Sequence, residues 1–279
     1  MKHFFLLILS LPTILFAQPT LEKAKTAYEN EYYKEAVDYF KNYLTQNPKS
    51  VEAREYLSAS YAELEKWQES ADIAKTLVEE FPENADYHFK YGGALGLVAK
   101  NSNPFKAMSL LDEVKTHLHK AAELDENHIQ SRRAMLEMYL ELPGIAGGSE
   151  SKAKQFAREI QNIDAADGKL AWAHIYQKSE DFNKAEAYYE TALDIQKSEK
   201  VYLNFSEFYA ETEQIEKQFE ILETGFKNLN SAKILLKYID LAKKNRKNIE
   251  KANRLLDSFQ PENPNSKSAE QLKKMNFDL

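Results

Sequence analysis

The chain has 279 residues, of which 43% are hydrophobic and 29% are charged, and its formal net charge is −7. These proportions are those of an ordinary folded protein and argue against long disordered stretches. The absence of cysteine excludes disulfides, thiolate metal sites and cysteine nucleophiles, and the acidic balance argues against broad nucleic-acid binding.

The first predicted element is a secretory leader at residues 1–17. Lys2 supplies a positive start, and an apolar run of 13 residues extends from Phe4 to Phe16. This run is shorter than the roughly 20 residues that a membrane-spanning helix needs, so we expect cleavage before Gln18 and no retained membrane anchor. The resulting expectation is a periplasmic or secreted protein, without a lipid anchor because a bacterial lipoprotein needs a cysteine.

The next segment predicts two consecutive helix pairs. Helices are expected over residues 20–30 and 33–46, and again over 51–64 and 67–81, with a proline closing each pair because proline cannot continue the helical hydrogen bonds. Six positions recur with a spacing of 34 residues. The first set is Ala24, Ala27, Ala36, Phe40, Tyr43 and Pro48, and the corresponding residues 34 positions later are Ser58, Tyr61, Ser70, Ala74, Leu77 and Pro82. The small residues permit close helix approach, while the large ones fill the interface between pairs.

The centre of the chain, residues 85–163, predicts an irregular pair of repeats. A helix is expected over 105–124, one to two turns longer than its counterparts, followed by helices over 129–142 and 150–163. The last two are separated by an enlarged loop that contains Pro143 and three glycines.

The regular pattern then returns and ends in a polar tail. Five positions recur with a spacing of 33 residues. The first set is Ala173, Tyr176, Ala185, Tyr189 and Ala192, and the corresponding residues 33 positions later are Ser206, Tyr209, Gln218, Leu222 and Gly225. A last, shorter pair is expected over 232–244 and 249–259, and the tail over 260–279 with a short helix at 269–275.

This order of small residue, aromatic, alanine, aromatic, alanine and proline resembles the tetratricopeptide repeat family, which is known for repeats of this period. The resemblance is to exported bacterial members and covers most of the chain after the leader. It implies an all-α fold, a right-handed solenoid of about six to seven stacked helix-turn-helix pairs over residues 18–259, and binding of a protein partner without a cofactor.

The enlarged loop allows one chemical reading. Gly147, Gly148 and Ser149 precede a helix, so their backbone N–H groups could form an anion nest. The alternative is that Ser149 caps the helix and the glycines make the turn, which we favour because the segment lacks the lysine and glycine spacing of a phosphate loop.

The other chemistry-bearing residues predict no catalytic or metal site. The histidines lack the spacing of zinc ligands and are interpreted as ordinary surface or groove residues. No nucleophile elbow is present, so we expect a protein that is not an enzyme.

The concave face is the expected binding surface of such a solenoid, and the repeat register assigns residues to it. The predicted partner-binding residues are Glu52, Glu55, Glu63, Asp86, Phe89, Leu97, His174, Gln177, Lys178 and Glu207. Their character predicts a partner with basic and apolar side chains, and the Lys and Asn pattern by which family members clamp a C-terminal carboxylate is absent.

The sequence therefore predicts a non-enzymatic scaffold or adaptor in the bacterial cell envelope that holds a protein segment in its groove. The alternative is a chaperone-like assembly factor that binds many envelope proteins through Phe89 and Leu97. An enzyme or small-anion binder at residues 143–149 is the third and least favoured reading.

Overall fold

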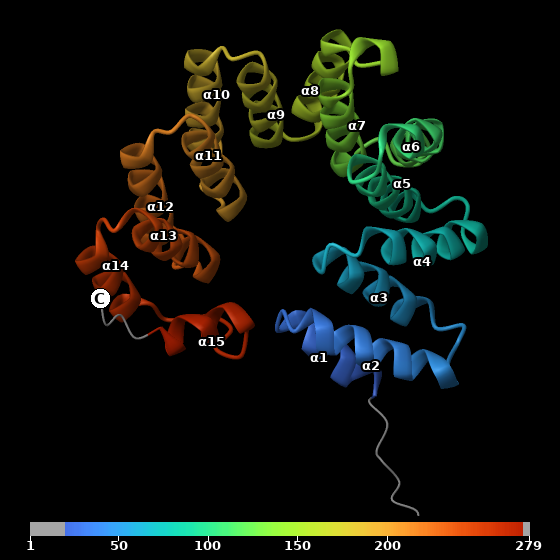
Figure 1. Ribbon diagram of the computed structural model, residues 1–279, viewed down its shortest axis with the longest axis horizontal. Helices are drawn as coiled ribbons and strands as arrows, with labels where there is room; N and C mark the ends of the chain where they lie inside the picture. The colour runs from blue at the N-terminus through green and yellow to red at the C-terminus, as the bar shows by residue number, and fades with distance from the viewer. Residues whose placement is uncertain (1–19, 276–279) are drawn as a thin grey trace, which may run out of the picture.

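A computed structural model describes residues 20–275, and the leader predicted at residues 1–17 lies outside this range. The described part is all-helical apart from connecting segments (Figure 1). The first half contains α1 (Leu21–Glu29), α2 (Tyr33–Gln46), α3 (Val51–Glu63), α4 (Trp67–Glu80), α5 (Ala85–Lys100), α6 (Pro104–Leu124), α7 (Ile129–Glu141) and the 3-10 turn η1 (Gly144–Ala146). The second half contains α8 (Glu150–Ile163), α9 (Ala165–Lys178), α10 (Phe182–Ile195), α11 (Glu199–Glu211), α12 (Ile215–Leu229), α13 (Ala232–Asn245), α14 (Ile249–Ser258) and α15 (Lys267–Lys274).

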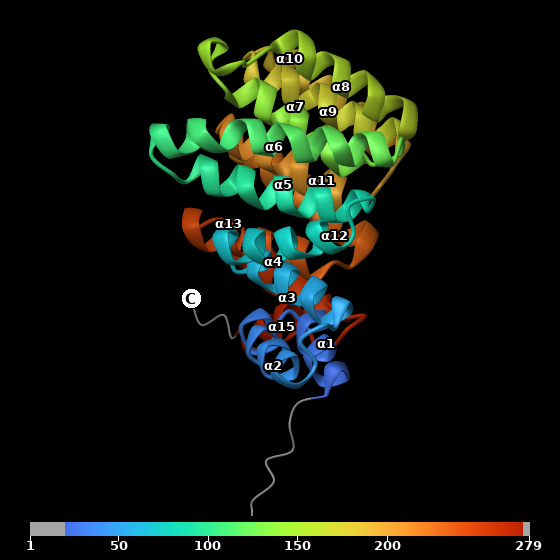
Figure 2. The same cartoon turned by 90° about the vertical axis from the view of Figure 1, so that its right-hand side faces the viewer.

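The helices stack as consecutive pairs that curve into a ring around a central opening (Figure 1). Most odd-numbered helices border this opening, and their even-numbered partners lie outside them. Seen from the side, the pairs form successive layers (Figure 2). The predicted class, an all-α solenoid of stacked helix-turn-helix pairs, is confirmed, and the predicted helices agree with the observed ones to within a few residues.

The repeated small residues pack as the sequence predicts. Ala24, Ala36 and Ala74 are completely buried between helices, beside the large side chains that fill the same layers. Ser58 and Ser70 occupy equivalent positions and donate reciprocally, each hydroxyl to the other residue's carbonyl oxygen at 3.0 Å. The pair therefore keeps the close approach of two alanines while satisfying both hydroxyls.

Within four of the helix pairs, the connecting turn places a glutamate in the left-handed backbone region. Glu31, Glu65, Glu180 and Glu213 have φ values between 56° and 66°. A residue with a Cβ atom is disfavoured there because that atom approaches the following carbonyl oxygen.

Replacing Glu65 by glycine is therefore expected to raise the free energy of unfolding by about 0.5–1 kcal/mol. Urea denaturation followed by circular dichroism measures this change. Glu65→Ala is the matched control, since it removes the same exposed carboxylate but keeps the Cβ atom. An equal gain from alanine would contradict the backbone explanation.

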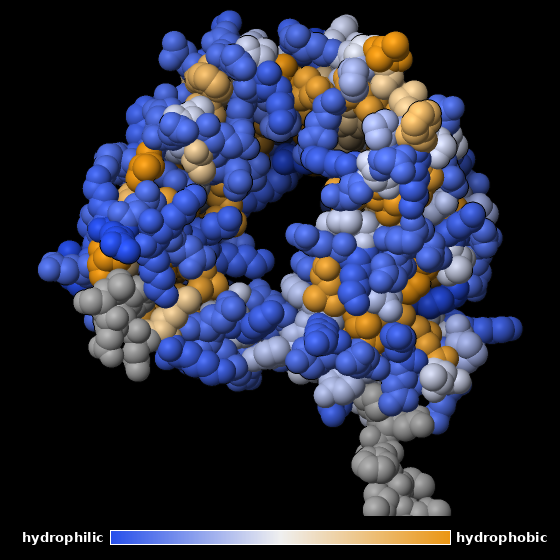
Figure 3. Space-filling model, in the orientation of Figure 1, coloured by the Kyte–Doolittle hydropathy of each residue, from blue (hydrophilic) through white to orange (hydrophobic). Residues whose placement is uncertain are grey.

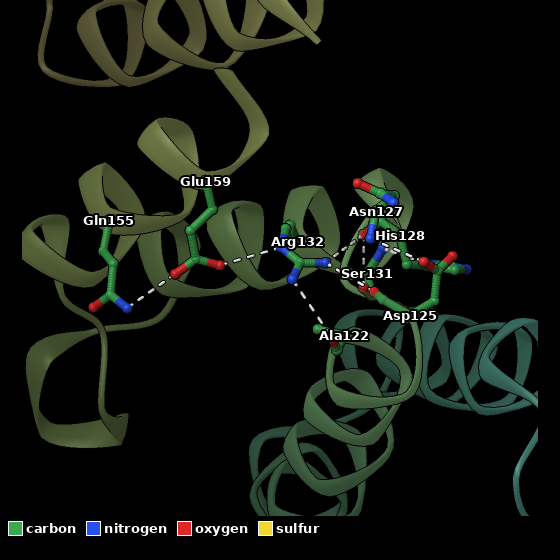
Figure 4. A network of polar contacts seen from close by, with 8 residues as sticks. All are labelled: Ala122, Asp125, Asn127, His128, Ser131, Arg132, Gln155 and Glu159. Atoms are coloured by element: carbon green, nitrogen blue, oxygen red, sulfur yellow. Dashed lines mark hydrogen bonds and ion pairs between the residues drawn. The ribbon is translucent and has the colours of Figure 1, made fainter. Parts of the chain in front are cut away.

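A buried arginine joins the three helices of the irregular centre (Figure 4). Arg132 on α7 donates from Nε to Glu159 on α8 at 3.2 Å. Its terminal nitrogens donate to the carbonyl oxygens of Ala122, Asp125 and His128 at 3.1–3.4 Å. The carbonyl oxygen of Ala122, near the end of the long helix α6, thereby obtains a partner. Those of Asp125 and His128 obtain a second donor beside the His128 N–H and the Ser131 hydroxyl.

Two histidines link α5 to α6 in the same region. His88 is buried, and its Nε2 donates to the carbonyl oxygen of Pro82 at 2.9 Å. Its Nδ1 must then accept from Nδ1 of His117, 2.8 Å away, when both rings are neutral. His128 is likewise buried and lies 3.1 Å from Asp86. The interpretation of His88 and His128 as surface or groove residues is therefore wrong, because both side chains complete contacts within the core.

Burial lowers the pKa of His117, and the neighbouring His88 lowers it further. The folded chain thus binds fewer protons than the unfolded chain as the pH falls through the ordinary histidine value of 6.5, so stability is lost on acidification. We expect the urea midpoint to fall between pH 7.5 and about 5.5, and to fall less in His117→Gln. The exposed His119 gives the control His119→Gln, which should retain the pH dependence of the parent.

The C-terminal tail folds back on the solenoid. Ala269 and Leu272 of α15 are buried, and α15 packs on α13. On its other side the tail meets the turn between α1 and α2, where the N–H of Lys267 donates to the carbonyl oxygen of Asn30 at 2.9 Å. Ser268 also donates to Glu31 through both its N–H and its hydroxyl. These contacts join the two ends of the described chain and close the ring seen in Figure 1.

Candidate functional site: an apolar groove on the concave face

The concave side of the first half of the ring contains a cavity of about 770 Å³, here named the apolar groove. Helices α3, α4, α5, α6 and α7 line it together with the loop after α7. Its apolar lining includes Ala59, Ala62, Phe89, Gly93, Gly96, Leu97, Met108, Leu111, Val114, Ala134, Met138 and Ile145. This volume is in the range of ligand sites in proteins, and the apolar lining is typical of them.

Three glycines of α5 explain why the groove exists. A Cβ atom at Gly92 would lie 3.2 Å from side-chain atoms of His117 and Leu118, so this glycine lets α5 and α6 approach closely. At Gly93 a Cβ atom would meet only the Phe89 ring, at 3.8 Å, because this position faces the open groove. At Gly96 a Cβ atom would likewise meet only Val114, at 3.6 Å. Between Phe89 and Leu97, which also line the groove, α5 therefore has a surface without side chains at Gly93 and Gly96.

Large apolar side chains extend the groove beyond its rim. Met108 of α6 and Ile145 of the loop line the groove and are 55% and 98% exposed, and Phe105, at the start of α6, is 90% exposed. Figure 3 shows hydrophobic patches beside the central opening where Figure 1 places α3 and α5. Large exposed apolar groups gathered at one cavity mark an interaction surface rather than scattered surface residues.

Most polar groups in the groove are already satisfied. Ser58 and Ser70 bond to each other, Lys100 pairs with Glu141 at 2.8 Å, and the Lys90 ammonium lies over the Tyr87 ring at 5.7 Å. Among the described residues, no asparagine, glutamine, threonine, tyrosine, arginine or histidine lines the groove. Its lining therefore offers few free hydrogen-bond partners.

Two carboxylates of the groove make no hydrogen bond or ion pair with the described residues. Glu63 lies on α3 and Glu137 on α7, and both side chains reach solvent. Partial desolvation by the surrounding wall raises the pKa of Glu137, while Arg133 opposes this shift. Both carboxylates are thus available to a cation on a bound molecule.

A second, smaller cavity of about 180 Å³ follows on the inner side of α7, α9 and α11. It is more polar, and Arg133, His174, Gln177, Glu207 and Glu211 contribute to its lining. Gln177 is fixed there because it donates to Glu211 at 2.6 Å and accepts from the Tyr189 hydroxyl at 2.8 Å. Burial lowers the pKa of His174, and Lys178 lowers it further, so His174 is neutral at pH 7.

The structure distributes the predicted binding residues among several places. Glu63, Phe89 and Leu97 line the apolar groove, and His174, Gln177 and Glu207 line the second cavity. Lys178 lies beside another hollow, next to the loop at 148–149.

The remaining predicted binding residues make contacts within the solenoid. Glu52 pairs with Lys25 at 2.8 Å, Glu55 accepts from the Tyr87 hydroxyl at 2.7 Å, and Asp86 contacts His128. None of these three residues lines the apolar groove. The groove therefore contains fewer acidic residues than the repeat register predicted.

The loop at 143–149 uses its N–H groups internally. The N–H groups of Gly147, Gly148 and Ser149 donate to carbonyl oxygens of Gly144, Pro143 and Tyr139 at 2.9–3.0 Å. The Ser149 hydroxyl accepts from the N–H of Lys152 at 3.3 Å and caps α8. An anion at the predicted nest would have to displace these bonds.

The repeat register assigns only residues of inner helices to the binding face, so part of the groove was not predicted. It omitted the contribution of α6, through Met108 and Leu111, and of the loop, through Ile145. The glycines at 92, 93 and 96 and the unusual length of α6 were the available signals. Together they indicate a helix pair whose inner side is left uncovered.

Within 20–275, no group of three or more His, Asp or Glu side chains is arranged to hold a metal ion. None of the helices in that range combines the length and the apolar character needed to cross a membrane.

Comparison with known proteins identifies the fold. Residues 21–85 match the tetratricopeptide repeat family. The structure is similar to that of TTC0263, a thermophilic tetratricopeptide repeat protein of Thermus thermophilus, with a TM-score of 0.57 and 17% identity over 68% of this chain and 97% of that one. It is also similar to yeast Tom70, with a TM-score of 0.55 and 16% identity over 92% of this chain, which spans only 54% of the Tom70 chain.

None of the curated protein sequences compared with the chain matches it. The family match thus covers the first two repeats, and the structural likeness extends the tetratricopeptide repeat fold over the rest of the described chain. Proteins with this fold generally mediate protein–protein interactions.

Proposed function

We propose that the protein is a non-enzymatic scaffold or adaptor of the bacterial cell envelope that binds a protein segment in the apolar groove. The observation that carries this proposal is the groove itself, which the described chain leaves open although its lining is predominantly apolar. Covering such a surface removes apolar area from water and thereby favours binding. The two free carboxylates, Glu63 and Glu137, favour a segment that also carries basic side chains.

The envelope location rests on the leader predicted at residues 1–17. If the leader is cleaved, N-terminal sequencing of protein from the native host will start at Gln18, and fractionation will place the protein in the periplasm or the medium. A protein that retains Met1 and remains in the cytoplasm would contradict the location but not the binding proposal.

Site-specific photocrosslinking in the native host tests the binding proposal. A photoreactive amino acid replaces Leu97 in the groove, and the control places it at Ala187, which is exposed on the outer helix α10. We expect crosslinked partners from position 97 and not from position 187. Equal crosslinking from both positions would show that the groove is not the binding face.

The number of partners separates the adaptor from the alternative, a chaperone-like assembly factor. One partner in stoichiometric amount supports the adaptor. A spread of envelope proteins at low occupancy supports the chaperone-like reading, which the exposed side chains of Phe105, Met108 and Ile145 favour because they widen the apolar surface.

A further inference from the structure

We infer that the segment held in the apolar groove is an amphipathic α-helix whose apolar face is flanked on both sides by basic residues. This inference rests on the proposed function and specifies the partner. Three observations carry it, namely the scarcity of hydrogen-bond partners in the groove, the bare surface of α5 and the positions of the two free carboxylates.

The groove is poorly suited to an extended peptide. An extended segment brings unpaired backbone N–H and C=O groups into the cavity, and each group that loses water without gaining a partner weakens binding. The serines, Lys100 and Glu141 of the lining are already engaged, and no amide side chain of the described residues lines it. Apart from Lys90, the Trp67 indole N–H and the carboxylates of Glu63 and Glu137 are the side-chain groups left for a peptide backbone, too few for an extended segment. A helix satisfies its own backbone groups and presents only side chains to the groove.

The bare surface of α5 allows another helix to approach closely. Gly93 faces the cavity without a close neighbour, and the adjacent inner helices contribute the small side chains Ala59 and Ala134. The separation of two packed helices depends on the side chains at their contact, so this surface accepts large apolar side chains from the occupant. Met108 and Ile145, exposed at the rim, would cover the same apolar face.

The carboxylates lie on opposite sides of this bare surface. Glu63 belongs to α3 and Glu137 to α7, and α5 lies between these two helices in the ring (Figure 1). A helix seated over α5 therefore meets a negative group on each side of its apolar face. Lysine or arginine at both borders of that face would complement them.

A displayed peptide library tests the inference on the purified protein. The library contains peptides of about 18 residues, or five helical turns, and half of its members carry a central proline pair that forbids a continuous helix. We expect selection to enrich proline-free peptides with apolar residues at helical spacing and basic residues beside them. The enriched peptides should become helical on binding, as measured by circular dichroism.

Groove variants show where the enriched peptides bind. Gly93→Leu fills the open position and should weaken binding by about tenfold or more. Ala187→Leu is the matched control, because it adds an apolar side chain at an exposed position of the outer helix α10, away from the groove, and should bind as the parent does. The double variant Glu63→Lys with Glu137→Lys should also weaken binding and reduce its dependence on salt. Unchanged binding by this double variant would show that the apolar face of the partner is not flanked by basic residues that contact Glu63 and Glu137.

The remaining outcomes separate this inference from the proposed function. If the library enriches proline-containing peptides that bind the parent and lose affinity for Gly93→Leu, the bound segment is not a helix. The inference is then wrong, and the proposed function is unaffected. Peptides that bind Gly93→Leu as they bind the parent, or a library that yields no binders, would overturn both. In the latter case, a fluorescent fatty acid bound by the parent and not by Gly93→Leu would identify the groove as a hydrocarbon site instead.

Discussion

Arg132→Ala is expected to lower the free energy of unfolding by about 3 kcal/mol. The Arg132 side chain is only 10% exposed and donates to one carboxylate and to three carbonyl oxygens from the α6–α7 junction. Its removal leaves the Ala122 carbonyl oxygen without a side-chain donor, takes one of two donors from the carbonyl oxygens of Asp125 and His128, and leaves a void among three helices. Chemical denaturation measures the total change, and hydrogen exchange shows whether the amides of α6, α7 and α8 lose protection together.

Arg158→Ala provides a matched control for this prediction. Arg158 lies on α8 one residue before Glu159, is exposed, and makes no hydrogen bond or ion pair with the described residues. Its removal should change stability by less than about 0.5 kcal/mol. A comparable loss from the two variants would mean that the effect comes from charge and not from the buried network.

Gly168→Ala is expected to lower the free energy of unfolding by about 2–3 kcal/mol, although it adds only one methyl group. Helices α8 and α9 are joined by the single residue Asp164, which ends one helix and caps the next. This short connection presses the start of α9 against α8. A Cβ atom at Gly168 would lie 2.3 Å from Cα and Cβ of Gln161, so the backbone of one helix would have to move.

Gly93→Ala is the matched control, because Gly93 is also helical but faces the open groove. There the methyl group meets no backbone, and alanine should raise stability by about 0.5–1 kcal/mol through its better helix propensity. Thermal and urea denaturation should show a lower free energy of unfolding for Gly168→Ala and a higher one for Gly93→Ala. A loss at both positions would show that the groove in solution is narrower than the structure indicates.

The helical elements were predictable from the sequence because their signals are local. Ser50, Asn84 and Ser149 cap helices at the positions where the pattern begins, and their side chains accept from the backbone of the first turn. The spacing of alanines and aromatics is likewise set within each pair. The long helix α6 and the Ser149 cap at the end of the loop at 143–149 were predictable for the same reason.

The groove could not be derived in the same way, because it depends on how neighbouring pairs are placed. The register assigned Glu52, Glu55 and Asp86 to the binding face, but Lys25, Tyr87 and His128 from other helices engage them. Sequence spacing places a residue on one side of its own helix. It does not show which residue of the next helix reaches it.

Stacked helix pairs follow from local features of the sequence, since helix caps, proline stops and the repeat of small and large residues act over a few turns. Three features arise only when the helices pack together: α5 leaves an open apolar surface, Glu63 and Glu137 remain unpaired beside it among the described residues, and the tail joins the turn after α1 at Asn30. Local patterns do not specify these features because the residues involved are far apart along the chain. Cavity shape, ion pairing and ring closure are set by residues tens to hundreds of positions apart, which meet only once the solenoid has acquired its curvature.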